Sequence, residues 1–362
     1  MKTLFNKFYN NKTVFVTGHT GFQGSWLILW LTLLGAKVIG YSLPPPTNPS
    51  LFDSIKIKKN ITSKIGDVND KEKLFSVMSK HAPDVVIHLA AQSLVRKSYE
   101  SPLETFSTNV LGTANLLESV RNVPSVKSCL IMTSDKAYEN KEWDYAYREN
   151  DPMGGHDPYS ASKGASELIV SSYRRSFYNK KNSPGIASIR AGNVIGGGDW
   201  SHDRLIPDCI RSLISNKKII LRNPKSIRPW QYVLESLSGL LLIGIKLAQN
   251  SQRYGGAWNI GPMTNDVSVK TIAEKIIKKW GNGSINIKKN SLHEAKFLRL
   301  DSSKITNMLK WKPTYSIKES MNETVDWYLA YKNNKKSIHD YTISQIENYV
   351  SKANKSNSVW ST

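Results

Sequence analysis

The sequence predicts an α/β protein in which a doubly wound, parallel Rossmann sheet is joined by a second, smaller substrate-binding domain. Short apolar strands alternate with helices from residue 13 to about residue 190. A glycine-rich loop joins the first strand to the first helix. Beyond residue 190 the segments become shorter and are punctuated by glycine and proline. The length of 362 residues agrees with about two domains.

The change in character near residue 190 predicts how the chain is divided. We expect a Rossmann domain over 1–190, rejoined by a segment at about 228–262. The substrate-binding domain is expected over 191–227 and 263–345, with a polar tail over 346–362 that is frayed from about residue 351. Since no long linker or repeat separates the two parts, they should pack together around a ligand cleft.

The first βαβ unit is the clearest in the sequence. Residues 13–17 are β-branched and aromatic, which indicates a buried strand. The pattern Gly18-x-x-Gly21-x-x-Gly24 follows at once, then an apolar helix through residue 34 and a second strand over 36–41. In this order the loop places backbone N–H groups and a helix N-terminus opposite a pyrophosphate, so we favour dinucleotide binding over a purely structural turn.

The alternation continues beyond this unit. Further strands are predicted at 65–68, 84–89, 128–133 and 185–190, and further helices at 72–80, 105–120, 159–178 and 269–280. Asp67, after the third strand, is either an adenine ligand or a helix cap. The second strand ends without an acidic residue for the adenosine ribose, so the sequence gives weak support for NAD over NADP.

Composition limits the partners and the compartment. Fifty lysines and arginines stand against 29 acids, a net charge of +21, which predicts attraction to anions. These cations are scattered, so we expect no nucleic-acid partner. Cys129 and Cys209 have no metal-ligand spacing around them, and we expect no metal. The longest apolar run, 26–34, is too short for a membrane span, and the N-terminus does not resemble an export signal, so we expect a cytoplasmic protein without a membrane partner.

Tyr159 and Lys163 form the second constellation. Their four-residue spacing places a phenol and an ammonium on one helical face, where the positive charge should lower the pKa of the tyrosine and make it a usable base. The same spacing recurs at Tyr328/Lys332 and Tyr331/Lys335 on a C-terminal helix, where we expect surface or packing roles.

The combined motifs resemble the extended short-chain dehydrogenase/reductase family, whose members act on nucleotide-activated sugars with a nicotinamide cofactor. From about residue 12 to 330, the order VFVTGHTGFQGSWL, HLAAQSLVRKSY, STNVLGT, TSDKAYEN, DPMGGHDPYSASKGASEL, IRAGNVIGGGDW, DRLIPD and SIRPWQYVLE is similar to that of the sugar-nucleotide 4,6-dehydratases. The resemblance implies NAD as the cofactor and the conversion of CDP-glucose to CDP-4-dehydro-6-deoxyglucose and water, a step of deoxysugar and polysaccharide biosynthesis.

The resemblance also assigns residues. It implies a catalytic set made of Ser134, Asp135, Lys136, Tyr159 and Lys163. The cofactor side is implied to include Gly18, His19, Gly21, Phe22, Gly24, Asp67, Val68, Leu89, Ala90, Ala91, Gln92 and Asn109, together with Tyr159 and Lys163. The substrate side is implied to include Ser93, Asn193, Arg204, Arg228, Trp230 and His293.

Asp135 and Lys136 are the discriminating pair, because dehydration needs an acid to expel a hydroxyl and simple epimerases do not. The resemblance implies that Asp135 protonates the departing 6-OH and that Lys136 removes the C5 proton. The thymidine-nucleotide relatives carry glutamate where Lys136 stands, so the base role of this lysine is the less secure of the two. The structural alternative is that Asp135 and Lys136 form only an exposed salt bridge with no part in the chemistry.

Three further alternatives stay open. Instead of a CDP-glucose 4,6-dehydratase, the protein could be a dehydratase of another nucleotide sugar, an epimerase of such a sugar, or a catalytically silent Rossmann protein that senses a nucleotide.

Members of the family also pair the helices at 105–120 and 159–177 across a dimer, which implies a homo-oligomer.

Overall fold

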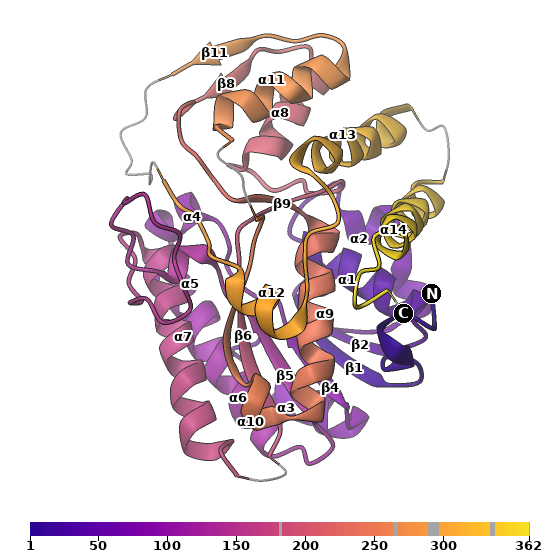
Figure 1. Ribbon diagram of the computed structural model, residues 1–362, viewed down its shortest axis with the longest axis vertical. Helices are drawn as coiled ribbons and strands as arrows, with labels where there is room; N and C mark the ends of the chain where they lie inside the picture. Colours follow the sequence, from indigo (N-terminus) through magenta and orange to yellow (C-terminus); the bar gives the residue numbers. More distant parts are fainter. Residues whose placement is uncertain (181–182, 264–266, 289–296, 334–336, 362) are drawn as a thin grey trace.

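The computed structural model describes residues 1–180, 183–263, 267–288, 297–333 and 337–361 (Figure 1). Within these residues seven parallel strands form one sheet in the order β10-β6-β5-β4-β1-β2-β3. The strands are β1 (Thr13–Thr17), β2 (Lys37–Ser42), β3 (Thr62–Ile65), β4 (Val85–His88), β5 (Ser128–Met132), β6 (Gly185–Ala191) and β10 (Gly256–Ile260). The predicted doubly wound parallel sheet is confirmed.

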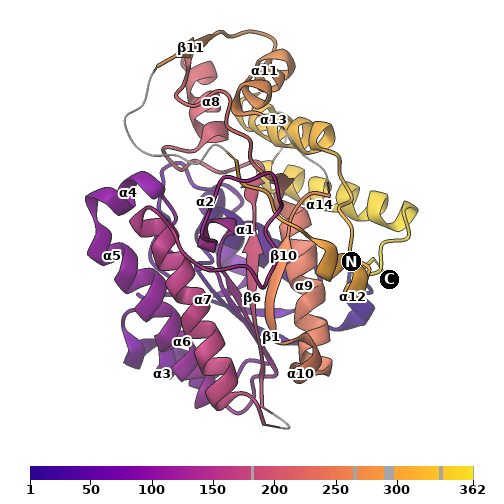
Figure 2. The same ribbon diagram turned by 60° about the vertical axis from the view of Figure 1, so that its left-hand side comes forward.

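Helices cover both faces of the sheet. One face carries α3 (Lys71–His81), α6 (Gly112–Arg121) and α7 (Pro158–Phe177), and the other carries α1 (Phe22–Leu33) and α9 (Val233–Gln249) (Figure 2). Strand side chains alternate between the two layers: Phe15 packs with the α3/α6/α7 layer, and its neighbours Val14 and Val16 pack with the α1/α9 layer. Because both faces are buried, the strands read as continuous apolar runs.

The apolar run at 26–34 is the core of α1. Every residue from Gly24 to Leu31 is buried. A helix that is apolar all round must be covered all round, and α1 meets this demand because the chain's C-terminal region packs against it: Trp30 contacts Tyr349 and Trp360 edge to face.

A smaller layer lies beyond the carboxyl ends of the strands, at the top of Figure 1. It contains α8 (Leu205–Ile214), β8 (Ile219–Leu221), α11 (Val269–Trp280), β11 (Ile285–Ile287) and α13 (Ile317–Asn333). Strands β8 and β11 pair in parallel. A second parallel pair, β7 (Asn193–Ile195) with β9 (Trp230–Tyr232), connects this layer to the sheet. The domain boundaries given above stay predictions.

Shorter elements complete the chain. They are η1 (Phe5–Lys7), α2 (Leu51–Ser54), η2 (Ile57–Asn60), α4 (Val95–Glu100), α5 (Pro102–Phe106), η3 (Ser107–Leu111), η4 (Asp135–Ala137), α10 (Ser251–Tyr254) and α12 (Ser303–Leu309). Two predictions need adjustment. The third strand ends at Ile65 rather than continuing to 68, and the helix expected over 105–120 is divided into α5, the π-helical turn η3 and α6. None of the helices in the described residues combines the length and apolar character that a membrane crossing requires.

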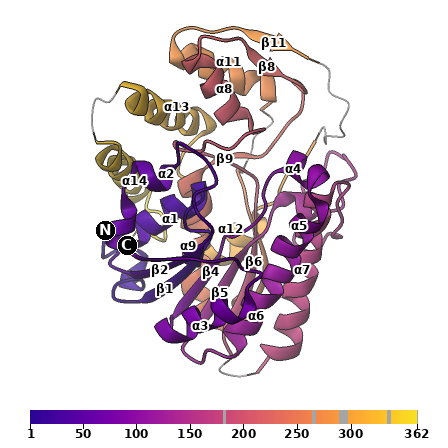
Figure 3. The ribbon, with the colours of Figure 1, turned by 180° about the vertical axis from the view of Figure 1, so that it is seen from behind.

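The expected polar tail over 346–362 does not describe the structure. Helix α14 (Ile338–Lys355) buries Ile346, Tyr349, Val350 and Ala353, and Trp360 is only 1% exposed. Trp360 stacks on Phe5 and on Tyr349, so the two ends of the chain lie side by side (Figure 3). A few large apolar residues in a polar segment are enough to dock it, because burial of one tryptophan outweighs the polarity of its exposed neighbours.

Candidate active site

The glycine loop between β1 and α1 is built for close approach. Gly18 has φ +72°, and a Cβ there would lie 2.6 Å from the backbone nitrogen of Ala90. A Cβ at Gly24 would collide with the carbonyl oxygen of Gly18. Gly21 is the N-cap of α1 and gives no side-chain acceptor, and the first turn holds no acidic residue. The N–H groups of that turn are therefore available to an anion, which fits the pyrophosphate of a dinucleotide.

The side chain of His19 contacts other residues of the protein instead of the space above the glycine loop. Its Nε2 lies 2.8 Å from Ser63 Oγ, and its ring packs against Phe52 at 5.4 Å. The ring occupies the space that a Cβ at Gly40 would need, and His19 is fully buried. Burial lowers the pKa of His19 to about 4, so the imidazole is neutral at physiological pH. Any part of His19 in cofactor binding then falls to its backbone.

Asn109 holds the predicted cofactor-side loop in place. Its Oδ1 accepts from Gln92 N at 2.9 Å, and its Nδ2 donates to Gln92 O at 2.9 Å and to Ser162 Oγ at 2.8 Å. The side chain thus links η3, the loop that carries Leu89, Ala90, Ala91 and Gln92, and helix α7. All these bonds are made within the chain, so Asn109 acts here by shaping the loop.

Asp67 and Val68 follow β3. Asp67 Oδ1 accepts from Asn69 N at 2.9 Å, and the N-cap of α3 is Asp70, whose carboxylate accepts from Lys73 N at 3.0 Å. Asp67 therefore does not cap the helix itself but shapes the turn in front of it. Val68 is buried against Gly112 of α6.

A cavity of about 680 Å³ lies between the sheet and the smaller layer. It brings together nearly all the described residues that were predicted for catalysis and substrate binding: Ser93, Ser134, Asp135, Lys136, Tyr159, Asn193, Arg204, Arg228 and Trp230. Phe22 begins α1, and its neighbour Gln23 reaches the cavity wall, which connects the glycine loop to the same space. His293 lies outside the described residues.

Tyr159 and Lys163 are placed by the start of α7. Asp157 caps the helix by accepting from Ser160 N at 2.9 Å, and Pro158 occupies its first turn. Tyr159 faces the cavity, while Lys163 lies behind it, with Nζ 3.4 Å from Met132 O and 6.0 Å from the centre of the Tyr159 ring.

The electrostatics at this pair differ from the sequence-based expectation. Burial raises the pKa of Tyr159 to about 12, although its hydrogen bond with Ser134 acts in the opposite direction. Burial also lowers the pKa of Lys163 to about 8. The expected lowering of the tyrosine pKa is wrong for the chain by itself, because spacing reveals the neighbouring charge but not the desolvation that opposes it.

Ser134, Asp135 and Lys136 form a tight turn after β5. Ser134 Oγ donates to Asp135 Oδ1 at 2.9 Å and accepts from Lys136 N at 3.1 Å. Asp135 is buried, which raises the pKa of its carboxyl even though Lys136 and Arg228 are near. Asp135 Oδ2 has no hydrogen-bond partner among the described residues. A carboxyl whose pKa is raised and whose second oxygen has no partner in the described chain can act as a general acid. The alternative of an exposed ion pair does not fit a buried aspartate.

The cavity wall is rich in guanidinium groups. Arg204 donates to Ser93 Oγ at 2.9 Å and pairs with Asp199 at 3.3 Å, and Arg228 is only 3% exposed. Asn193 lies opposite Trp230 in the β7/β9 pair, and the Trp230 indole donates to Val267 O at 3.0 Å. These positions suit a diphosphate, which takes charge-assisted hydrogen bonds from arginine.

Sequence reasoning missed two further arginines. Arg96 of α4 and Arg222, just after β8, line the cavity and both pair with Asp203, at 3.6 and 2.8 Å. Arg96 stands inside the motif HLAAQSLVRKSY, so its position in that motif was a usable signal. Arg222 had none, because only the fold brings β8 of the smaller layer to the cavity. Across the described ranges, no three histidine, cysteine, aspartate or glutamate side chains are grouped to hold a metal ion.

A glycine loop at the first βα crossover and a Tyr-x-x-x-Lys helix beside an arginine-lined cavity together define an extended short-chain dehydrogenase/reductase. The sequence model described as GDP-mannose 4,6 dehydratase matches residues 15–324. The chain belongs to that family.

Known proteins of several specificities are similar to this chain. The CDP-glucose 4,6-dehydratase of Salmonella typhimurium is 49% identical over 90% of this chain and 92% of its own length. A dTDP-glucose 4,6-dehydratase from Bacillus anthracis, solved in complex with NAD, superposes with a TM-score of 0.74 at 24% identity, over 90% of this chain and 98% of the other. A UDP-glucose 4-epimerase from Thermotoga maritima, solved with UDP-glucose, gives 0.76 at 22% identity, over 89% and 99%. The two structures establish the fold alone.

Proposed function

We propose that the protein is an NAD-dependent CDP-glucose 4,6-dehydratase, a lyase that converts CDP-glucose to CDP-4-dehydro-6-deoxyglucose and water. The observation that carries the reaction type is that the Asp135 carboxyl and the Tyr159 phenol share one cavity, with the pKa of the carboxyl raised by burial. An epimerase needs the tyrosine but has no hydroxyl to expel. The choice of CDP-glucose is supported by the 49% identical relative from Salmonella typhimurium.

The glycine loop fits the diphosphate of NAD, because a Cβ at Gly18 or Gly24 would close the approach. Gly18, Gly21 and Gly24 would hold the pyrophosphate, and the loop braced by Asn109 would line the nicotinamide side, with Tyr159 and Lys163 beyond it. When bound, NAD supplies a reversible two-electron acceptor, so that oxidation at C4 and reduction at C6 balance within one turnover.

Tyr159 accepts the proton of the sugar 4-OH while C4 is oxidised. Ser134, which is hydrogen-bonded to this phenol, orients the hydroxyl. The phenol must lose its own proton before it can accept this one, and burial opposes that loss. The positive charge of Lys163, whose Nζ lies 6.0 Å from the ring centre, favours the phenolate. The resulting C4 ketone makes the C5 hydrogen acidic.

The turn after β5 then carries out the elimination. Lys136 removes the C5 proton, and Asp135 gives its proton to the 6-oxygen, which leaves as water. When C6 is reduced, Lys136 returns a proton to C5. The free Oδ2 of Asp135 is the donor atom. Meanwhile Arg204 and Arg228 hold the substrate diphosphate.

The test is a comparison of CDP-, UDP-, GDP- and dTDP-glucose as substrates with added NAD. We expect the 4-keto-6-deoxy product from CDP-glucose, with deuterium placed at C4 recovered in the new C6 methyl group. If only another nucleotide sugar is turned over, the proposed reaction type is kept and the proposed substrate is wrong. Inversion at C4 without loss of water would identify an epimerase, and no turnover of any sugar would favour the nucleotide sensor.

We also propose that the enzyme is a homo-oligomer in the cytoplasm. Several large apolar side chains are exposed over α5, η3 and α7: Leu103 is 82%, Leu111 58% and Leu168 63% exposed. These helices form one side of the molecule (Figure 2). A second copy of the chain would cover this face, and sedimentation measurements test that. The reduced, buried Cys129 and Cys209 suit a reducing compartment.

A further inference from the structure

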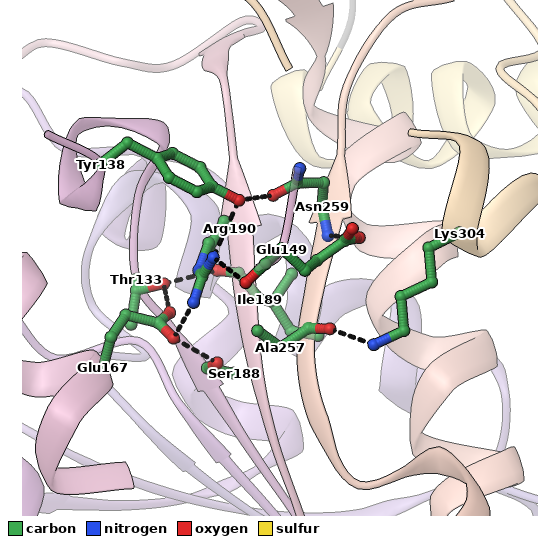
Figure 4. Close-up of polar contacts among 10 residues, drawn as sticks. All are labelled: Thr133, Tyr138, Glu149, Glu167, Ser188, Ile189, Arg190, Ala257, Asn259 and Lys304. Carbon is green, nitrogen blue, oxygen red and sulfur yellow. Dashed lines mark hydrogen bonds and ion pairs between the residues drawn. The ribbon is translucent and has the colours of Figure 1, made fainter. Parts of the chain in front are cut away.

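The turn that carries Asp135 and Lys136 is bracketed by two side chains whose roles are not yet explained. Thr133 directly precedes Ser134, and Tyr138 directly follows Ala137. Both lie at the cavity wall, and Tyr138 is 1% exposed. Figure 4 shows that the two side chains point to the same buried ion pair, which Glu167 of α7 and Arg190 of β6 form.

Each side of the turn is bonded to one member of that pair. Thr133 Oγ1 donates to Glu167 Oε1 at 2.5 Å, and Arg190 Nη1 donates to the Tyr138 hydroxyl at 2.8 Å. Arg190 Nη2 and Glu167 Oε2 are 2.8 Å apart, and the two side chains are 5% and 4% exposed. The Arg190 guanidinium also lies over the Tyr138 ring, 4.8 Å from its centre. One ion pair therefore fixes both ends of the turn.

The pair is itself held from several elements. Ser188 Oγ donates to Glu167 Oε2 at 2.7 Å, and the Tyr138 hydroxyl donates a hydrogen bond to Asn259 Oδ1 of β10 at 2.7 Å. Arg190 Nη1 also donates to Glu149 O at 3.0 Å, while Asn259 N donates to the Glu149 carboxylate at 2.8 Å. With anchors on α7, β6 and β10, the pair has little freedom to move.

The stability of the fold does not explain why Glu167 and Arg190 are charged residues. An ion pair taken out of water gains little over apolar residues of the same size, so its presence calls for a role in placing other groups. Glu167 lies one helical turn beyond Lys163, which lies one turn beyond Tyr159, so all three share a face of α7. The pair thus joins the helix that carries the oxidation residues to the turn that carries the elimination residues.

We propose that Glu167 and Arg190 are positioning residues, which hold the Ser134–Ala137 turn so that Asp135 and Lys136 face the C5–C6 bond of the sugar. The proposal rests on the function proposed above. It assigns no proton transfer to the pair. It requires that loosening the pair slows elimination more than oxidation, because Asp135 and Lys136 both stand on the turn, whereas Tyr159 and Lys163 stand on α7.

The sharpest variant is Tyr138→Phe, which removes one hydroxyl and keeps the ring. In a single turnover with CDP-glucose, C4 oxidation should stay within about threefold of the wild type, while elimination falls about tenfold or more, because a small misplacement of reacting groups is costly. The reduced cofactor would then accumulate. Glu167→Gln, of nearly the same size, should slow elimination as well, but it also removes the carboxylate that raises the pKa of Lys163, so oxidation should slow with it. Tyr178→Phe is the matched control, since Tyr178 is another buried tyrosine, bonded to Leu117 O at 2.5 Å outside the cavity.

A second measurement does not depend on the substrate. Amide hydrogen exchange at Lys136 and Ala137, whose N–H groups bond within the turn at 3.1 and 3.2 Å, should be faster in Tyr138→Phe than in the wild type and in Tyr178→Phe. Unchanged exchange, or equal slowing of oxidation and elimination, would overturn the positioning role. A wild type that makes no product from CDP-glucose would instead count against the proposed function, and the exchange result would still decide on the positioning role.

Discussion

Replacement of Asp135 by asparagine separates the two halves of the proposed reaction. Asparagine has the same shape, and its Oδ1 can still accept from Ser134 Oγ, which lies 2.9 Å from the aspartate oxygen. The geometry of the turn should therefore persist. What is lost is the proton at Oδ2, the atom without a partner among the described residues. Tyr159 and Lys163 are unchanged, so oxidation at C4 should proceed.

The size of the effect follows from the role. General acid catalysis contributes about 10²- to 10⁴-fold, so elimination should slow by at least about 100-fold, or about 2.7 kcal/mol in the activation barrier. Stopped-flow absorbance in the reduced-nicotinamide band should rise and stay high, and mass spectrometry should find the 6-OH retained. Asp208→Asn is the control, because Asp208 lines the same cavity and its pKa is also raised by burial, but it pairs with Arg211. A normal product yield from Asp135→Asn would refute the assignment of the acid.

Three further outcomes are expected. Arg228→Ala should raise KM for the nucleotide sugar about tenfold or more with kcat little changed, since a phosphate contact stabilises ground and transition states alike; a loss confined to kcat would contradict this. His88 is buried and its pKa is lowered from 6.5 to about 3, so the unfolded chain takes up a proton that the folded one does not, and stability present above pH 6.5 is lost as pH falls. Between about pH 7.5 and 5.5 the wild type should lose about 1.4 kcal/mol more unfolding free energy than His88→Asn, measured in urea; equal pH dependence would exclude the effect. Trp360→Ala should cost about 3–5 kcal/mol in the same assay, and Trp143→Ala, at a site that is 45% exposed, should cost little; similar losses would show that the C-terminal segment is not docked.

The Rossmann half could be predicted because its signals are local. Strand periodicity and the glycine loop located β1, α1 and β2 within about two residues. Ser134 and Asn193, which the family resemblance supplied, line one cavity in the structure. Long-range contacts gave no such signal. Arg222 lines the cavity only because β8 belongs to the smaller layer on its far side, and Trp360 docks only because α1 needs a cover. Arg190 did leave a trace, as a charge inside an apolar strand that must find a partner.

Burial shifts the pKa values of the proposed acid and the proposed base in the same direction. It raises the pKa of Asp135 and raises that of Tyr159 to about 12, which favours the protonated form of both. This suits a group that must give up a proton during elimination, but it opposes a group that must accept one during oxidation. The base therefore needs a positive charge of its own, and Lys163 supplies it only while it stays protonated. Burial lowers the pKa of Lys163 to about 8, and the Glu167 carboxylate raises it. The ion pair that fixes the elimination turn thus also helps to keep the charge on which the tyrosine depends, which gives a physical reason for Glu167 and Arg190 to be buried at the junction of α7 and β6.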